Sequence, residues 1–156
     1  MVVLAAPVKI PPKSGAAMCA LTPADFQSVG VGGTAKPTAN VQDGGASVYC
    51  VYAGKSSAMG GVELDVFHPA GPSIADAKET LRMAIGEGSS AQTPLQPIAI
   101  AGADEARWSP AVKSGGPVFA SIAVRRGTLV FVLGIPASAT AQTQLTKLVA
   151  MVLERF

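Results

Sequence analysis

The sequence predicts an α+β fold, in which an antiparallel sheet of about five to six strands packs against helices. Three observations lead to this prediction. Two pairs of apolar-rich segments have the pattern of hairpins. Two other segments place apolar residues at helical spacing. The strands predicted at 118–124 and 129–135 are apolar on both faces, so we expect that part of the sheet to be covered on both sides.

One ordinary domain accounts for the chain. Of its 156 residues 49% are hydrophobic, which is enough for a single sizeable core. Charged residues make up only 14%, and a net charge of +2 is too small to argue for nucleic acid or an anionic membrane as a partner. No stretch approaches the roughly 18 apolar residues of a transmembrane helix. We therefore expect a single α+β domain over 19–156.

Residues 1–18 are expected to form an extended, Pro-rich arm. Met1 to Ala6 are apolar, but prolines and lysines follow them and no basic region precedes them. Residues 16–19, AAMC, are similar to a lipoprotein cleavage box, although Met18 fits poorly before the cysteine. A leader removed from the chain, or a membrane anchor through a segment absent here, stays open as an alternative.

The first predicted helix covers 21–30. Thr22 has the position of an N-cap, Asp25 completes a capping box, and Gly30 ends the helix. Residues 30–45 are polar and rich in glycine, so we expect a loop there.

A hairpin is predicted next, from a strand at 46–53 and its return at 60–69, with a turn at GKSS between them. Alternation divides each strand into two faces. The side chains expected to face inward are Val48, Cys50, Tyr52, Val62, Leu64 and Val66; Glu63, Asp65 and Phe67 are expected to face outward.

The clearest helix is predicted over 73–86, where Ser73 and Asp76 form a capping box and Gly86 provides the C-terminal cap. Its apolar stripe consists of Ile74, Ala77, Leu81, Ala84 and Ile85. Short strands are expected at 97–102 and 105–109, then a hairpin with its turn at Arg126-Gly127, and last a helix whose apolar side holds Leu145, Leu148, Val149, Val152 and Phe156.

The two cysteines indicate a disulfide. Cys19 lies just before the first predicted helix and Cys50 in the middle of the first strand, so a bond would link these elements and imply an oxidising compartment. Two unrelated buried thiols are the alternative. A catalytic thiol is disfavoured, because the chain has a single histidine to serve it.

Two glycine-containing motifs are better explained by loops than by nucleotide binding. GVGGTA at 30–35 fits the dinucleotide pattern, but a helix precedes it and Lys36-Pro37 follow it, where a strand and a helix are needed. AGKSS at 53–57 has the end of a phosphate loop, but Tyr49 stands where its first glycine belongs. We expect no cofactor.

Catalytic residues are hard to assemble from this chain. The lone His68, before a proline, is expected to be a capping or surface residue, and its isolation argues against His-cluster metal sites and most hydrolase triads. Glu63 and Asp65 are expected to be charges on the exposed face of a strand. The enzyme alternative is a small hydrolase-type site made of Asp104, Glu105, Arg107 or His68.

The one trace of a binding site is aromatic. Trp108, the only tryptophan, follows Arg107, and such a pair can stack on a ligand. Tyr49 or Tyr52 could share that surface. Alternatively, Trp108 has a structural role and covers one end of the core.

The layout of LTPADFQSVG after one cysteine, a second cysteine in the first strand, IAGADEARWSP, a hairpin and the ending LVAMVLERF resembles a known group. The group comprises small secreted or lipid-anchored bacterial proteins of unknown function with a PsbP-like α/β/α sandwich. The resemblance covers 19–156 and implies that Cys19 and Cys50 are the family's disulfide pair. It also implies a non-enzymatic domain of the cell envelope.

The sequence hypothesis is therefore a periplasmic or secreted, non-catalytic binding domain whose partner is a protein or a small ligand. We expect a monomer or a weak homodimer. An assembly or chaperone-like subunit, in which an apolar hairpin edge pairs with another chain, is the alternative.

Overall fold

A computed structural model describes residues 16–42, 47–53, 62–67, 73–88, 95–112 and 119–156. Its strands are β1 (Thr38–Gln42), β2 (Ser47–Ala53), β3 (Val62–Phe67), β4 (Gln96–Pro97), β5 (Glu105–Val112), β6 (Phe119–Arg126) and β7 (Leu129–Pro136). The helices are the short 3-10 turn η1 (Ala16–Met18), α1 (Pro23–Ser28), α2 (Ile74–Gly88) and α3 (Ala141–Arg155).

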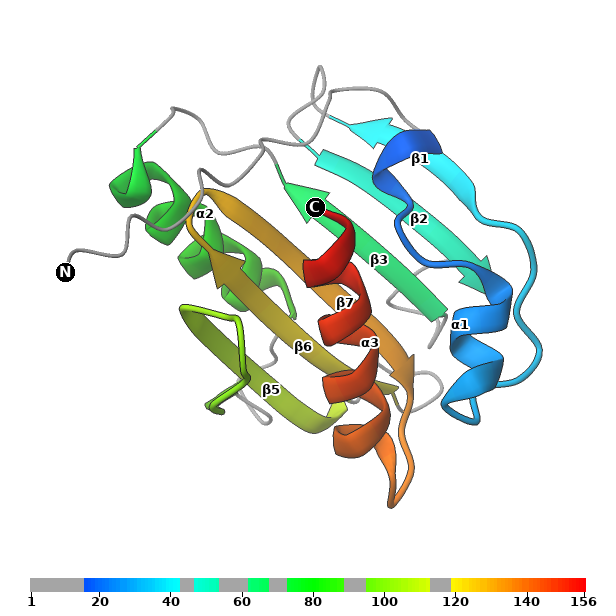
Figure 1. Ribbon diagram of the computed structural model, residues 1–156. Helices are drawn as coiled ribbons and strands as arrows, with labels where there is room; N and C mark the ends of the chain where they lie inside the picture. The colour runs from blue at the N-terminus through cyan, green and yellow to red at the C-terminus, as the bar shows by residue number, and fades with distance from the viewer. Residues whose placement is uncertain (1–15, 43–46, 54–61, 68–72, 89–94, 113–118) are drawn as a thin grey trace, which may run out of the picture.

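The seven strands form one antiparallel sheet in the order β1-β2-β3-β7-β6-β5-β4. Figure 1 shows α1 and α3 on one face of this sheet and α2 on the other. The predicted α+β class is confirmed, although the sheet has seven strands, one more than the upper end of the expected five to six. The arrangement has three layers, with the sheet in the middle.

The two edge strands differ most from the prediction. β1 lies within 30–45, where we expected a loop, because its residues are polar and mostly exposed and so lack a strand's apolar alternation. Pairing with β2 holds it in the sheet, with Thr38 opposite Val51. At the other edge the strand expected at 97–102 is only Gln96–Pro97, and the chain turns soon afterwards at Gly102.

The central hairpin of β6 and β7 is apolar on both faces, as predicted, and helices cover both. Alternate residues of the two strands pack in the larger core with α1 and α3: Ala120, Ile122, Val124, Leu129, Phe131, Leu133 and Ile135. The residues between them meet α2 in a smaller cluster that holds Ala77, Leu81, Leu95, Ala123 and Val130. The turn between β6 and β7 consists of Gly127 and Thr128, one residue later than expected, because Arg126 still pairs with Leu129.

The first hairpin also has the predicted inward face. Val48, Cys50, Tyr52, Val62, Leu64 and Val66 are all buried in the larger core. The predicted exposure of Glu63 is wrong, since this side chain is buried, and Asp65 is half-buried. The turn GKSS and His68 lie outside the described residues.

Both predicted capping boxes are present. Thr22 and Asp25 exchange side-chain and backbone bonds at the start of α1, and Ser73 and Asp76 do the same before α2. α2 continues past the expected stop at Gly86 as far as Gly88. Its first apolar residue, Ile74, was expected in the buried stripe but is exposed.

Polar contacts at both ends hold α1 antiparallel to α3. Near the C-terminus of α3, Arg155 donates two bonds to the carboxylate of Asp25, at 2.6 and 3.0 Å, and a third to the Ala20 carbonyl at 2.7 Å. Near its N-terminus, the Gln144 amide donates to the Val29 carbonyl at 3.0 Å. The short helix α1 is therefore fixed at both ends.

The predicted disulfide joins Cys19 to Cys50, with an S–S length of 2.04 Å and Cα atoms 5.7 Å apart. It links the segment before α1 to the middle of β2. The domain begins earlier than residue 19, because Met18 is fully buried in the core and η1 packs beside β1. Residues 1–15 of the predicted arm lie outside the described residues.

Removal of this disulfide should destabilise the fold. The bond closes a loop with a sequence separation of 31, so in the chain-entropy account the double variant Cys19→Ala/Cys50→Ala loses about 3–4 kcal/mol of unfolding free energy. Urea denaturation of the two unreduced proteins measures this difference. Wild type treated with a reductant is the control and should match the variant. Equal stability of variant and oxidised wild type would contradict the expectation.

The Asp25–Arg155 ion pair should contribute to stability in a pH-dependent way. Hydrogen bonds from Arg155 hold the pKa of the Asp25 carboxyl well below its usual value of 3.8. The unfolded state therefore takes up the proton first, so the contribution is present above about pH 4 and is lost as the pH falls below that value. Because Arg155 is partly exposed, Asp25→Asn should cost only about 1 kcal/mol at neutral pH.

Urea unfolding at neutral pH and at pH 3 or below (about one pH unit under the ordinary carboxyl pKa) tests this expectation. The difference between wild type and Asp25→Asn should shrink in acid. A constant difference would show that the ionisation of Asp25 plays no part.

Candidate ligand-binding site

Alternation along β5 separates the two residues that we expected to act together. The Arg107 side chain lies on the α2 face of the sheet, where it lines a pocket, whereas Trp108 packs against the larger core on the opposite face. Neighbouring strand residues point to opposite faces of a sheet. Trp108 and Arg107 therefore cannot stack together on one ligand.

The two tyrosines are separated in the same way. Tyr52 is buried on the α1 face with its ring centroid 4.7 Å from that of Phe26, and burial raises the pKa of its hydroxyl. Tyr49 lies on the α2 face and donates a hydrogen bond to the Glu63 carboxylate. Trp108, Arg107, Tyr52 and Tyr49 thus form no common surface, and a ligand-binding role for any of them stays a prediction.

A close approach between neighbouring strands explains why Glu63 is buried. Gly134 of β7 lies directly opposite Glu63 of β3. A Cβ atom at Gly134 would stand 3.3 Å from Cγ of Glu63. The missing side chain therefore provides the space in which Glu63 lies flat along the sheet and reaches Tyr49.

The acidic residues of the enzyme alternative are bound to a buried arginine. Arg125, only 5% exposed, lies across the strand pair from Glu105 and donates to it at 3.2 Å. It also donates to Asp104 at 3.4 Å, and the Gly127 backbone N–H donates to the same Asp104 oxygen at 2.6 Å. These hydrogen bonds link the turn before β5 to the turn between β6 and β7. Asp104 and Glu105 thus already have structural partners.

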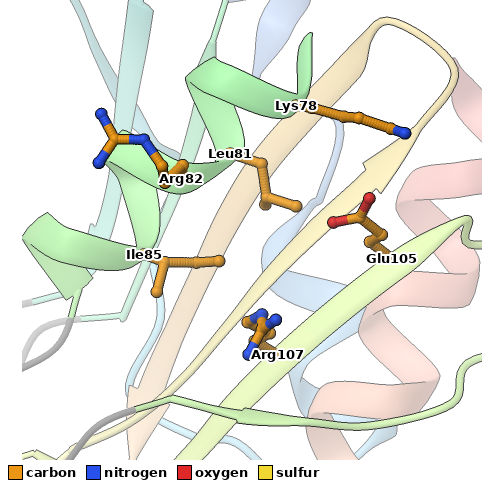
Figure 2. A pocket seen from close by; sticks show the side chains of 6 residues that line it. All are labelled: Lys78, Leu81, Arg82, Ile85, Glu105 and Arg107. Atoms are coloured by element: carbon orange, nitrogen blue, oxygen red, sulfur yellow. The ribbon is translucent and has the colours of Figure 1, made fainter. Parts of the chain in front are cut away.

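A pocket of about 270 Å³ lies between α2 and β5. Four residues from one face of α2 line it, at the helical spacing i, i+3, i+4 and i+7, together with two residues from one face of β5. We call it the α2–β5 pocket; its lining residues are Lys78, Leu81, Arg82, Ile85, Glu105 and Arg107. Figure 2 shows Leu81 and Ile85 extending from α2 toward β5, where Glu105 and Arg107 lie, whereas the guanidinium of Arg82 points away from β5.

The position of α2 creates this space. The helix packs mainly on β6 and β7, and the small Ala123 lies beside Arg107 in the sheet and takes part in the cluster under the helix. Strand β5 therefore lies beside the strands that α2 mainly covers. Leu81, which is buried, and Ile85, which is half-buried, give the pocket an apolar wall.

Some charged side chains of the pocket form ion pairs, and others do not. Arg82 binds Glu79 one helical turn before it through two bonds of 2.9 and 2.5 Å, and Glu105 accepts from Arg125. Within the described part of the chain, Lys78 and Arg107 have no carboxylate within ion-pair distance. The arrangement therefore presents two available cations beside an apolar wall.

Of the six lining residues, the sequence prediction singled out Arg107 as a ligand-binding residue and Glu105 only as part of the enzyme alternative. Leu81 and Ile85 were assigned to the apolar stripe of α2, where they do lie, while Lys78 and Arg82 carried no signal. Charged residues beside an apolar stripe are usual on a surface helix. Only the strand order, which brings β5 next to the α2 layer, shows that these residues converge.

The chain matches no protein-family model, no curated protein and no solved structure. None of the described helices is long and apolar enough to cross a membrane. Within the same residues, no group of three or more His, Cys, Asp or Glu side chains is placed to hold a metal ion.

Replacement of Arg125 should destabilise the fold much more than replacement of Arg82. In Arg125→Met two adjacent carboxylates lose their buried cation, which should cost about 2–3 kcal/mol, less than for a fully buried pair because Asp104 and Glu105 are partly exposed. The matched control Arg82→Met breaks a solvent-exposed pair and should change stability little. Urea unfolding of both variants tests the contrast, and equal effects would contradict it.

Proposed function

We propose that this protein is an exported, non-catalytic domain that binds a small ligand in the α2–β5 pocket. One observation carries the proposal: Lys78 and Arg107 face an apolar-walled pocket without a carboxylate partner among the described residues. Ligand pockets typically combine an apolar lining with a few polar groups that fix orientation. A volume of about 270 Å³ suits a small molecule better than a protein segment.

The disulfide supports export. Disulfides persist mainly in oxidising compartments such as the periplasm or the extracellular space, and are rare in the cytosol. We place the protein in the periplasm or among secreted proteins on this basis. The three layers and the cysteine pair are compatible with a PsbP-like bacterial envelope protein, and that relationship is part of the proposal.

A second candidate is assembly through a sheet edge. The apolar hairpin that we first considered for this role is unsuitable, because β6 and β7 each pair with a strand on both sides. Edge strand β1 is a better candidate, since it carries no charged residue and exposes Val41. Unprotected edges of this kind can pair with another chain.

An NMR screen of the oxidised full chain tests the proposal. Small organic anions, cations and neutral compounds are added to the ¹⁵N-labelled protein, and we expect shifted amide signals from both α2 and β5. Failure of every compound to shift these signals, or chemical conversion of a bound compound, would contradict a non-catalytic binding domain. Sedimentation reports on the second candidate: a dimer that Val41→Lys abolishes would favour pairing through β1.

A further inference from the structure

We infer that the α2–β5 pocket selects a small organic molecule with one net negative charge and an apolar body, such as a short-chain carboxylate. This inference rests on the proposed function, and adds the chemical class of the ligand. Three features of the pocket carry it: the ion pairs around its rim, the position of its apolar residues, and the way in which Glu105 is held.

The ion pairs leave an excess of one positive charge. Four cationic side chains lie in or next to the pocket (Lys78, Arg82, Arg107 and Arg125), against three carboxylates (Glu79, Asp104 and Glu105). Glu79 takes up Arg82, while Asp104 and Glu105 share Arg125. Arg125 neutralises one of these two carboxylates, which leaves one negative charge against the two positive charges of Lys78 and Arg107. A ligand with a single negative charge therefore makes the site neutral.

The apolar residues define the rest of the ligand. Leu81 and Ile85 belong to the same helix face as Lys78, one and two turns further along. In Figure 2 both side chains extend toward the gap between Lys78 and Arg107. An acid group that reaches either cation therefore places an attached hydrocarbon against these two side chains. The pocket is just below the roughly 300–1,000 Å³ typical of ligand sites, so the body is small.

Glu105 is the residue that could cancel the positive charge. It lies two residues from Arg107 on the same face of β5, a spacing at which opposite charges can approach. Arg125, directly across the strand pair, instead holds Oε1 of Glu105 at 3.2 Å. Arg125 is thus a positioning residue that keeps Arg107 available, and Glu105 weakens anion binding without preventing it.

This role of Glu105 separates the monoanion from a zwitterion. An amino acid would place its ammonium group on Glu105, so loss of that carboxylate would weaken its binding. A simple carboxylate is repelled by Glu105, so the same substitution would strengthen its binding. Glu105→Gln therefore distinguishes the two ligand classes by the sign of its effect.

The test titrates the oxidised full chain with hexanoate, and with hexylammonium, hexanamide and norleucine as cationic, neutral and zwitterionic counterparts of similar size. Amide shifts in α2 and β5 give the dissociation constants. We expect hexanoate to bind best. Lys78→Gln and Arg107→Gln should each weaken it by about twofold to fivefold, the range for a partly exposed charge pair. Glu105→Gln should tighten it.

Lys147→Gln is the matched control, because Lys147 is exposed on α3 at the opposite face of the sheet; it should leave hexanoate binding unchanged. Tighter binding of norleucine that Glu105→Gln weakens, or preference for hexylammonium or hexanamide, would overturn the monoanion class while leaving the pocket as a ligand site. Absence of pocket shifts with all four probes and with the wider screen would overturn the proposed function as well.

Discussion

Pairing between β3 and β7 joins two parts of the chain that otherwise form separate units. On one side lie β1, β2 and β3, and on the other β7, β6, β5 and β4. Each part alone would expose an additional strand edge, β3 or β7, with unpaired backbone N–H and C=O groups. Their union gives a face broad enough for α1 and α3 to cover side by side. The disulfide strengthens this arrangement, since it ties the segment before α1 to β2.

Local sequence signals predicted most of the fold. The capping boxes at Thr22 and Ser73 act within one helical turn, and the alternation around Cys50 reflects a single strand, so neither depends on distant residues. Strand β1 lacks such a signal, because it has no apolar face and is held in the sheet by its backbone pairing with β2. Burial of Glu63 could not be predicted either, since it follows from the register that places Gly134 opposite it.

The candidate site was harder to predict because it belongs to no single element. Lys78 and Arg107 are ordinary surface charges on an amphipathic helix and on a strand, and their convergence depends on the strand order. In a chain with only 14% charged residues, most charges near the pocket are already paired. Lys78 and Arg107 stand out because they have no such partner among the described residues. Electrostatics and topology must therefore be considered together before the site can be recognised.

The contact between Gly134 and Glu63 has a consequence for sequence variation. A side chain at position 134 would crowd Cγ of Glu63, since its Cβ would lie only 3.3 Å away. The two positions are therefore coupled: a long side chain on β3 favours glycine on β7, while a shorter side chain on β3 would accommodate alanine there with less displacement. In chains descended from a common ancestor with this fold, substitutions at these two sites should occur together.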